Sequence, residues 1–127
     1  MSPIIKVTGN VVTGVNKGSY YVRVYSDEIK KILGSEPYYG TLNVMVSEDD
    51  YNKVKSYAKG VIKGFERYGK KFYDVFYLRC RVKNVDGIIV FPTMGGHKNV
   101  LEIILPQKID VKVGEEVSIE VYANDFA

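Results

Sequence analysis

The sequence predicts a mainly β fold, a small closed barrel of short strands with one or two short helices. Strand-favouring residues gather in at least six short runs, separated by glycine, proline and polar residues. The chain lacks the regular alternation of strand and helix that a parallel α/β sheet requires. Many short strands with so little helix favour a barrel that closes on itself. The length of 127 residues favours a single domain, which we place at residues 1–127.

The chain begins with two predicted strands. Residues 4–13 ("IIKVTGNVVT") are rich in β-branched residues and predict a strand with a bend at Gly9. Residues 14–19 ("GVNKGS") have the composition of a loop, and residues 20–25 ("YYVRVY") resume a strand pattern. Two strands joined by a polar, glycine-containing loop indicate a β-hairpin.

A helix is predicted over residues 26–33 ("SDEIKKIL"), with Ser26 as its N-cap and Gly34 as its C-cap. The stretch "EPYYGTLNV" follows, a turn that leads into a strand at 41–46. Ser47 precedes three acidic residues and could cap one helical turn.

The second half of the chain reads almost entirely as strands. A hairpin is predicted over 60–82 with "YGKK" as its turn, and the glycine-containing segment 93–99 as a loop. The remaining predicted strands cover residues 85–92, 100–106 and 115–123.

Composition and charge exclude several classes of protein. The net charge of +3 is low for a duplex-DNA binder, and we expect no nucleic-acid partner. Cys80 is the only cysteine, so an intrachain disulfide is impossible. Because disulfides are typical of secreted proteins, we expect a location inside the cell. Neither a membrane-spanning run nor a signal peptide is recognisable, so we expect a cytoplasmic protein without a membrane partner. We also expect a monomer.

Thr41 and Asn43 are the first candidates for chemistry. In a strand, alternate side chains point to the same face, so the Thr41 hydroxyl and the Asn43 amide should lie side by side. Both supply neutral oxygen donors, which Mg²⁺ accepts when phosphates provide the negative charge. On spacing alone, a polar outer face of a half-exposed strand is the favoured explanation, because this spacing is very common.

Three further features could take part in a site. Gly14 and Gly18 would let the backbone approach a phosphate group closely, although a plain hairpin loop explains them too. Glu102 interrupts the apolar strand "VLEIILP", where a carboxylate needs a partner or a ligand unless that face is solvated. His97 is the only histidine and cannot form a zinc site without companions.

Five segments in order resemble the archaeal CTP-dependent riboflavin kinases over roughly residues 4–122. They are "VTGNVVTGVNKGSYYV", "ILGSEPYYGTLNV", "IKGFERYGKKFYDV", "VDGIIVFPT" and "NVLEIILPQKI". The resemblance implies a six-stranded cradle-loop barrel. It also implies transfer of the terminal phosphoryl group of CTP to the 5′-hydroxyl of riboflavin, assisted by Mg²⁺ or another hard divalent cation, with FMN and CDP as products.

The resemblance also implies roles for individual residues. Thr41 and Asn43 would be metal ligands, and Glu102 would contact the ribityl chain and act on the attacking hydroxyl. Thr93 or His97 would help to hold the flavin. The nucleotide would be bound by two segments, which consist of Val15, Asn16, Lys17, Gly18, Ser19 and Tyr20, and of Gln107, Lys108, Ile109 and Asp110.

The chain departs from the family pattern at two positions that bear on the nucleotide. Asn16 stands where the family usually has a glycine, and Asp110 stands where it often has an arginine. These departures favour one alternative, a flavin or nucleotide sensor without catalysis. A second alternative is a nucleic-acid-binding barrel, favoured by the mixture of basic and aromatic residues in "KKFYDVFYLRCRVK". Binding without turnover would identify the first, and a salt-dependent mobility shift the second.

Overall fold

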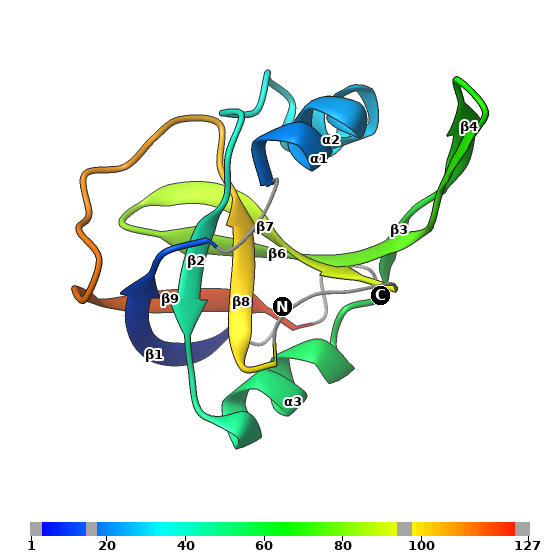
Figure 1. Ribbon diagram of the computed structural model, residues 1–127. Helices are drawn as coiled ribbons and strands as arrows, with labels where there is room; N and C mark the ends of the chain where they lie inside the picture. Colours follow the sequence, from blue (N-terminus) through cyan, green and yellow to red (C-terminus); the bar gives the residue numbers. More distant parts are fainter. Residues whose placement is uncertain (1–3, 15–17, 94–97, 124–127) are drawn as a thin grey trace.

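The computed structural model describes residues 4–14, 18–93 and 98–123, and its centre is a closed antiparallel barrel of six strands (Figure 1). Each strand pairs with the next around the ring, and β6 closes the ring by pairing with β9 as well as with β7. The order around the barrel is β6 (Val75–Val82), β7 (Val85–Pro92), β8 (Val100–Ile104), β2 (Leu42–Met45), β1 (Ile4–Val12) and β9 (Glu116–Tyr122). The predicted fold class is therefore confirmed.

The barrel strands bury apolar side chains on both of their faces. Inward-pointing residues such as Leu78, Leu101 and Ile119 fill the barrel and are 0% exposed. Outward-pointing residues such as Ile88 and Ile104 belong to a second cluster outside the barrel. Full burial of one such aliphatic side chain contributes about 1.5–3 kcal/mol, so the outer cluster can hold further elements against the barrel.

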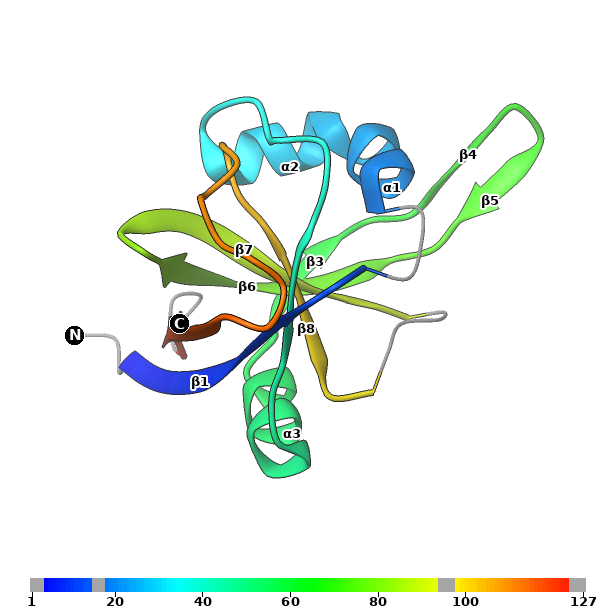
Figure 2. The same ribbon diagram turned by 60° about the vertical axis from the view of Figure 1, so that its left-hand side comes forward.

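Two short helices cover this outer apolar face. They are α1 (Gly18–Val24) and α2 (Ser26–Leu33), which follow each other almost without interruption. Val22, Tyr25 and Ile29 project from them into the outer cluster. Figure 2 shows both helices on one side of the barrel and α3 (Glu48–Ser56) on the other.

The structure corrects the prediction of a strand over residues 20–25: residues 20–24 form most of α1, and Tyr25 is the N-cap of α2. No hairpin therefore joins them to β1, which pairs with β2 and β9. A strand would turn alternate side chains away from the barrel. A helix turns Val22 and Tyr25 toward it together, and burial decides the conformation against the local β propensity.

The other predicted helices are confirmed with changes at their ends. The N-cap of α2 is Tyr25 without a side-chain hydrogen bond, so Ser26 is the first helical residue and the predicted cap is wrong. Gly34 ends α2 in the left-handed conformation, as predicted, at φ 79°. Ser47 caps α3 by accepting a hydrogen bond from the Asp50 backbone N–H, and that helix is longer than the single predicted turn.

A hairpin arm extends from the barrel beside α1. Strand β3 (Gly60–Ile62) pairs with β6, and beyond it β4 (Phe65–Arg67) pairs with β5 (Lys70–Phe72). Tyr68 and Gly69 form the predicted turn, with φ values of 55° and 72°. We call residues 63–74 the arm; Figures 1 and 2 show it projecting past α1. In the part of the chain that the structure describes, no helix has the length and apolar character needed to cross a membrane.

Candidate active site

Two cavities meet at Thr41 and Asn43. The larger has a volume of about 370 Å³ and lies between α1, the arm and the outer faces of β7 and β8. The smaller, of about 280 Å³, lies between the end of β1, the turn before β2 and the segment 107–113. Gly14, Thr41 and Asn43 line both cavities. Any ligand in one cavity can therefore approach a ligand in the other at this point.

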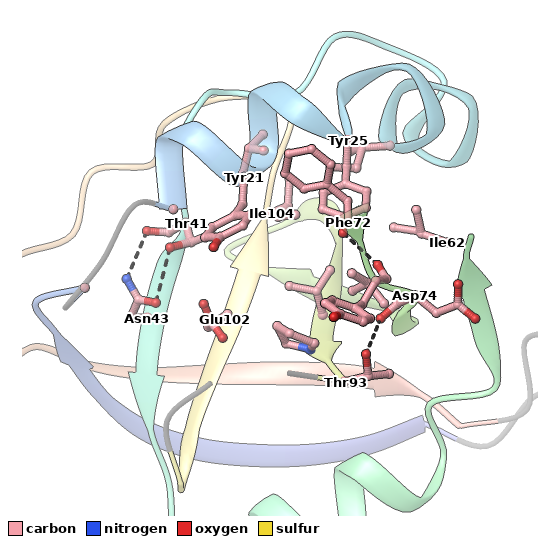
Figure 3. A pocket seen from close by; sticks show the side chains of 18 of the residues that line it. Tyr21, Tyr25, Thr41, Asn43, Ile62, Phe72, Asp74, Thr93, Glu102 and Ile104 are labelled. Atoms are coloured by element: carbon pink, nitrogen blue, oxygen red, sulfur yellow. Dashed lines mark hydrogen bonds between the residues drawn. The ribbon is translucent and has the colours of Figure 1, made fainter. Parts of the chain in front are cut away.

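Thr41 and Asn43 hold each other in place. The Thr41 hydroxyl donates to Asn43 Oδ1 at 3.2 Å, and Asn43 Nδ2 donates to the Thr41 carbonyl oxygen at 3.3 Å (Figure 3). Asn43 is only 8% exposed and is the one buried polar side chain among the residues that the structure describes. The prediction that these two side chains share a face is confirmed.

Two glycines lie beside this pair, at positions where the side chain of any larger residue would collide with Thr41 or Asn43. A Cβ atom added to Gly14 would lie 2.6 Å from Asn43 Nδ2, and one added to Gly18 would lie 2.9 Å from Thr41 Oγ1. Both distances are shorter than ordinary van der Waals contact. The loop that joins β1 to α1 therefore begins and ends in contact with the two candidate metal ligands.

Glu102 adds a carboxylate to the same surface. It lies directly opposite Asn43 in the pairing of β2 with β8, and opposite Val90 in the pairing of β8 with β7. Its neighbours Leu101 and Ile103 point into the barrel, so Glu102 points outward, as the alternation predicts, and lines the larger cavity. Burial raises the pKa of Tyr51, and the negative charge of Glu102 raises it further.

The larger cavity has an apolar depth and a polar edge. The two helices, the arm and the barrel all contribute apolar side chains to its lining. These are Val22, Tyr25, Ile29, Ile62, Phe72, Val75, Val90 and Ile104. On the polar edge, the Thr93 hydroxyl donates to the Asp74 backbone oxygen at 3.0 Å. Asp74 Oδ1 in turn accepts from the Gly64 N–H at 2.7 Å and so ties together the two strands at the base of the arm.

The other predicted site residues are distributed as follows. Gly18 and Thr93 line the larger cavity, and Gln107, Lys108 and Ile109 line the smaller. Ser19 and Tyr20 lie in the first turn of α1 and, like Asp110, line neither of these two cavities. The remaining four, Val15, Asn16, Lys17 and His97, lie outside the described residues.

Reasoning from the sequence missed the contribution of the arm to the site. Lys70, Lys71 and Asp74 line the larger cavity, as does Tyr21 of α1. Asp74 and Thr93 are 19 positions apart, and the pairing of β6 with β7 brings them together, so that the Thr93 hydroxyl donates to the Asp74 backbone oxygen. The sequence does predict the hairpin that forms the arm, but it does not predict that the arm covers a cavity.

The donor set suits a hard divalent cation only if a ligand brings negative charge. In the described part of the chain, no cluster of three or more His, Cys, Asp or Glu side chains could hold a metal ion. The Thr41 and Asn43 oxygens are 3.2 Å apart. Adjacent ligands around octahedral Mg²⁺ are separated by about 2.9 Å, so both oxygens could bind one ion after a small adjustment.

Comparison with known proteins gives the family. The family model for a CTP-dependent riboflavin kinase domain, described as "Domain of unknown function DUF120", matches residues 11–121. The riboflavin kinase of Pyrococcus abyssi is 38% identical over 122 residues, which cover 91% of this chain and 58% of that protein. The riboflavin kinase of Pyrococcus furiosus is 35% identical over 121 residues, which cover 90% of this chain and 57% of that protein.

The riboflavin kinase of Methanobrevibacter smithii is 39% identical over 127 residues, which cover 91% of this chain and 99% of that protein. The chain thus spans just over half the length of the two Pyrococcus relatives and nearly all of the Methanobrevibacter one. The matched region begins in the last residues of β1, ends within β9 and includes every element between them. The chain belongs to the archaeal CTP-dependent riboflavin kinase family.

Proposed function

We propose that this protein transfers the terminal phosphoryl group of CTP to the 5′-hydroxyl of riboflavin, giving FMN and CDP. The observation that carries the proposal is the meeting of two cavities at Thr41 and Asn43. Phosphoryl transfer needs two ligands placed end to end, with charge neutralisation at the point where they touch. Family membership supplies the identity of the two ligands.

The larger cavity suits riboflavin. Its apolar depth, formed around Phe72 and Ile104, matches the flat isoalloxazine ring, and its polar end at Glu102 and Asn43 matches the ribityl hydroxyls. In this orientation the 5′-hydroxyl points toward the junction of the two cavities. Thr93 lies on the polar edge and can accept a hydrogen bond from the flavin while its own hydroxyl donates to Asp74.

The smaller cavity suits the nucleotide. Gln107, Lys108 and Ile109 form one wall of it, and the Lys108 ammonium group supplies positive charge near the phosphates. Gly14 and Gly18 bring the loop backbone close to the Thr41–Asn43 pair, where the terminal phosphate would lie. The proposed donor is CTP, because the family model names it.

Thr41 and Asn43 would hold Mg²⁺ or another hard divalent cation through their side-chain oxygens. A bound cation would neutralise charge on the phosphate oxygens during transfer. The mutual hydrogen bonds of the pair fix both side chains before any ligand arrives, which lowers the cost of ordering them on binding.

Glu102 would orient the 5′-hydroxyl and accept its proton. The oxygen of that hydroxyl forms a bond to the terminal phosphorus of CTP, the bond from that phosphorus to the bridging oxygen of CDP breaks, and the proton passes to the Glu102 carboxylate. Glu102 lies opposite Asn43 across two paired strands, which places it beside the junction where the hydroxyl would react.

A turnover assay tests the proposal. The protein is incubated with riboflavin, Mg²⁺ and each of the four common nucleoside triphosphates in turn, and the flavins are separated by chromatography. FMN should appear, and most of it with CTP. Absence of FMN with all four nucleotides would overturn the proposal, and riboflavin binding without turnover would identify a flavin-binding module instead.

A further inference from the structure

Two adjacent tyrosines in the turn before β2 have similar exposure and different surroundings. Tyr38 and Tyr39 are 44% and 41% exposed. Tyr38 lines the smaller cavity, whereas Tyr39 lines neither of the two cavities and lies under the guanidinium group of Arg23 from α1, 4.9 Å from Cζ to the ring centroid. One ring therefore faces a ligand site, and the other attaches α1 to the turn.

The position of Tyr38 is fixed by contacts on both of its sides. Its backbone N–H donates to the Leu105 carbonyl oxygen at 2.8 Å, which ties the turn to the end of β8. Its ring lies over Gly40, where an added Cβ atom would be only 3.0 Å from the Tyr38 Cε1 atom. The ring therefore lies against Gly40, and Tyr38 lines the cavity although nearly half of the residue is exposed.

The rest of this cavity shows which part of a nucleotide would meet Tyr38. Thr41 and Asn43 lie at the junction with the larger cavity, so the phosphates belong at that end. Leu42, Ile103, Ile109, Val111 and Val113 supply apolar surface to the remainder of the lining. An aromatic ring in a cavity with this apolar lining suits the flat face of a base.

This inference rests on the proposed function. We propose that Tyr38 stacks on the base of the nucleotide donor and is a positioning residue for that base. Stacking on an aromatic ring depends on the π face that every base has, and it is therefore nearly independent of base identity. Tyr38 would supply affinity for the nucleoside end of the donor. The preference among bases would come from polar groups elsewhere in the cavity.

Calorimetric titration of the whole protein, without turnover, tests this role. Three variants are compared with the wild type: Tyr38→Ala, Tyr38→Phe and Tyr38→Leu. Each is titrated with CTP in the presence of Mg²⁺, and with inorganic tripolyphosphate as a ligand that lacks the base. Tyr38→Ala and Tyr38→Leu should weaken CTP binding on the order of tenfold, Tyr38→Phe should retain it, and tripolyphosphate affinity should stay within about twofold throughout.

Tyr39→Ala is the matched control, because it removes a neighbouring ring of similar exposure that faces away from the cavity. It should leave CTP affinity unchanged. Steady-state kinetics should show a raised KM for CTP and an unchanged KM for riboflavin in Tyr38→Ala. Other nucleoside triphosphates that the wild type binds should lose affinity by a similar factor.

The outcomes separate this inference from the proposed function. Wild-type protein that binds no nucleotide would overturn the proposed function and the inference with it. Wild-type protein that binds CTP, together with a Tyr38→Ala variant that binds it equally well, would overturn the stacking role alone. Equal losses of CTP and tripolyphosphate affinity would also overturn it, because the effect would then lie at the phosphates.

Discussion

Thr41 and Asn43 share hydrogen bonds with each other and lie beside two glycines, so each side chain orients the other. Gly14 and Gly18 close off the space beside them. The oxygen atoms that would bind a metal ion thus lie side by side where the two cavities share their lining. This arrangement could be predicted in part, because strand alternation places the two side chains on one face. The contact with the glycines depends on how the loop folds back and could not be predicted.

Removing either candidate ligand should impair turnover without unfolding the barrel. Thr41→Ala and Asn43→Ala should each lower kcat/KM on the order of 100-fold at low Mg²⁺, and higher Mg²⁺ should restore part of the loss. The measurement is FMN formation across a Mg²⁺ series. Thr8→Ala is the control, because Thr8 is exposed on β1 and bonds only to Ser118 Oγ, at 3.3 Å, among the hydrogen bonds found. Normal turnover in both variants would reduce the pair to a polar feature of the strand.

Glu102→Gln tests the proton acceptor. The amide keeps the size and hydrogen-bonding capacity of the side chain but cannot take up a proton at neutral pH. We expect kcat to fall by about 10²–10⁴-fold with little change in the KM for riboflavin. The acidic limb of the pH–rate profile should disappear as well. Near-normal kcat with an unchanged pH profile would show that Glu102 only orients the substrate.

Among the elements, α1 shows where sequence reasoning failed and why. "YYVRVY" is rich in the aromatic and β-branched residues that favour strands. Val22, Tyr25 and Ile29 nevertheless recur at spacings of three and four, and all three are buried against the barrel. That periodicity extends from α1 into α2 and becomes apparent only when residues 18–33 are considered together. The prediction of a separate helix over residues 26–33 divided this spacing between two elements, so the helical pattern was not recognised.

The arm is the second element whose role depends on tertiary contacts. Its local pairing could be predicted from the "YGKK" turn, which the structure confirms. Its position over the larger cavity depends on Asp74 at its base and on α1 beside it. Lys70 lies over the ring of Tyr20, 5.4 Å from the centroid, and so connects the arm to that helix.

Asp74→Ala should loosen the arm and weaken flavin binding selectively. The variant loses the acceptor for the Gly64 N–H, which lies 2.7 Å from Asp74 Oδ1. A hydrogen bond to a charged group contributes about 1.5–3 kcal/mol, enough to shift the local equilibrium by tenfold or more. We expect a several-fold higher KM for riboflavin, an unchanged KM for CTP, and faster tryptic cleavage after Arg67, Lys70 or Lys71.

Asp74→Asn is the matched variant, because it keeps an oxygen that can accept the bond from Gly64. It should behave much more like the wild type in both KM values and in cleavage rate. Equal increases in the two KM values would contradict a role confined to the flavin cavity.

At the scale of the whole molecule, both the barrel and the arm depend on the pairing that closes the barrel. Many short strands with little helix predicted a barrel, and the structure confirms the barrel although residues 20–24 form a helix instead of a strand. The pairing of β6 with β9 joins residues about forty positions apart, such as Cys80 and Val121, and no local pattern specifies it. Because β6 also pairs with β3 and β7, the same strand supports both the barrel and the arm.

Cys80 offers a direct test of how the closed barrel behaves. Its thiol is 0% exposed in the barrel interior, and burial raises its pKa far above the usual value. A thiol reagent should therefore react only when the barrel opens. The complex of CTP with Mg²⁺, bound as one ligand at about 100 times its Kd, should slow that reaction by about 100-fold. The measurement is the rate of labelling at fixed reagent concentration.

Denatured protein is the reference for this experiment and should react promptly at its single thiol. Native protein that reacted at the same rate would contradict a closed interior. A native rate unaffected by CTP would contradict the link between nucleotide binding and barrel stability.

The shared wall of the two cavities also matters for inhibition. Gly14, Thr41 and Asn43 line both, so the ends of the two proposed substrates would come closest to each other at these residues. A bisubstrate compound, with riboflavin and cytidine joined through a chain of phosphates, could occupy both cavities at once. Its affinity would exceed that of either half because the second half binds intramolecularly. Such a compound would compete with both substrates, whereas an inhibitor confined to one cavity would compete with only one.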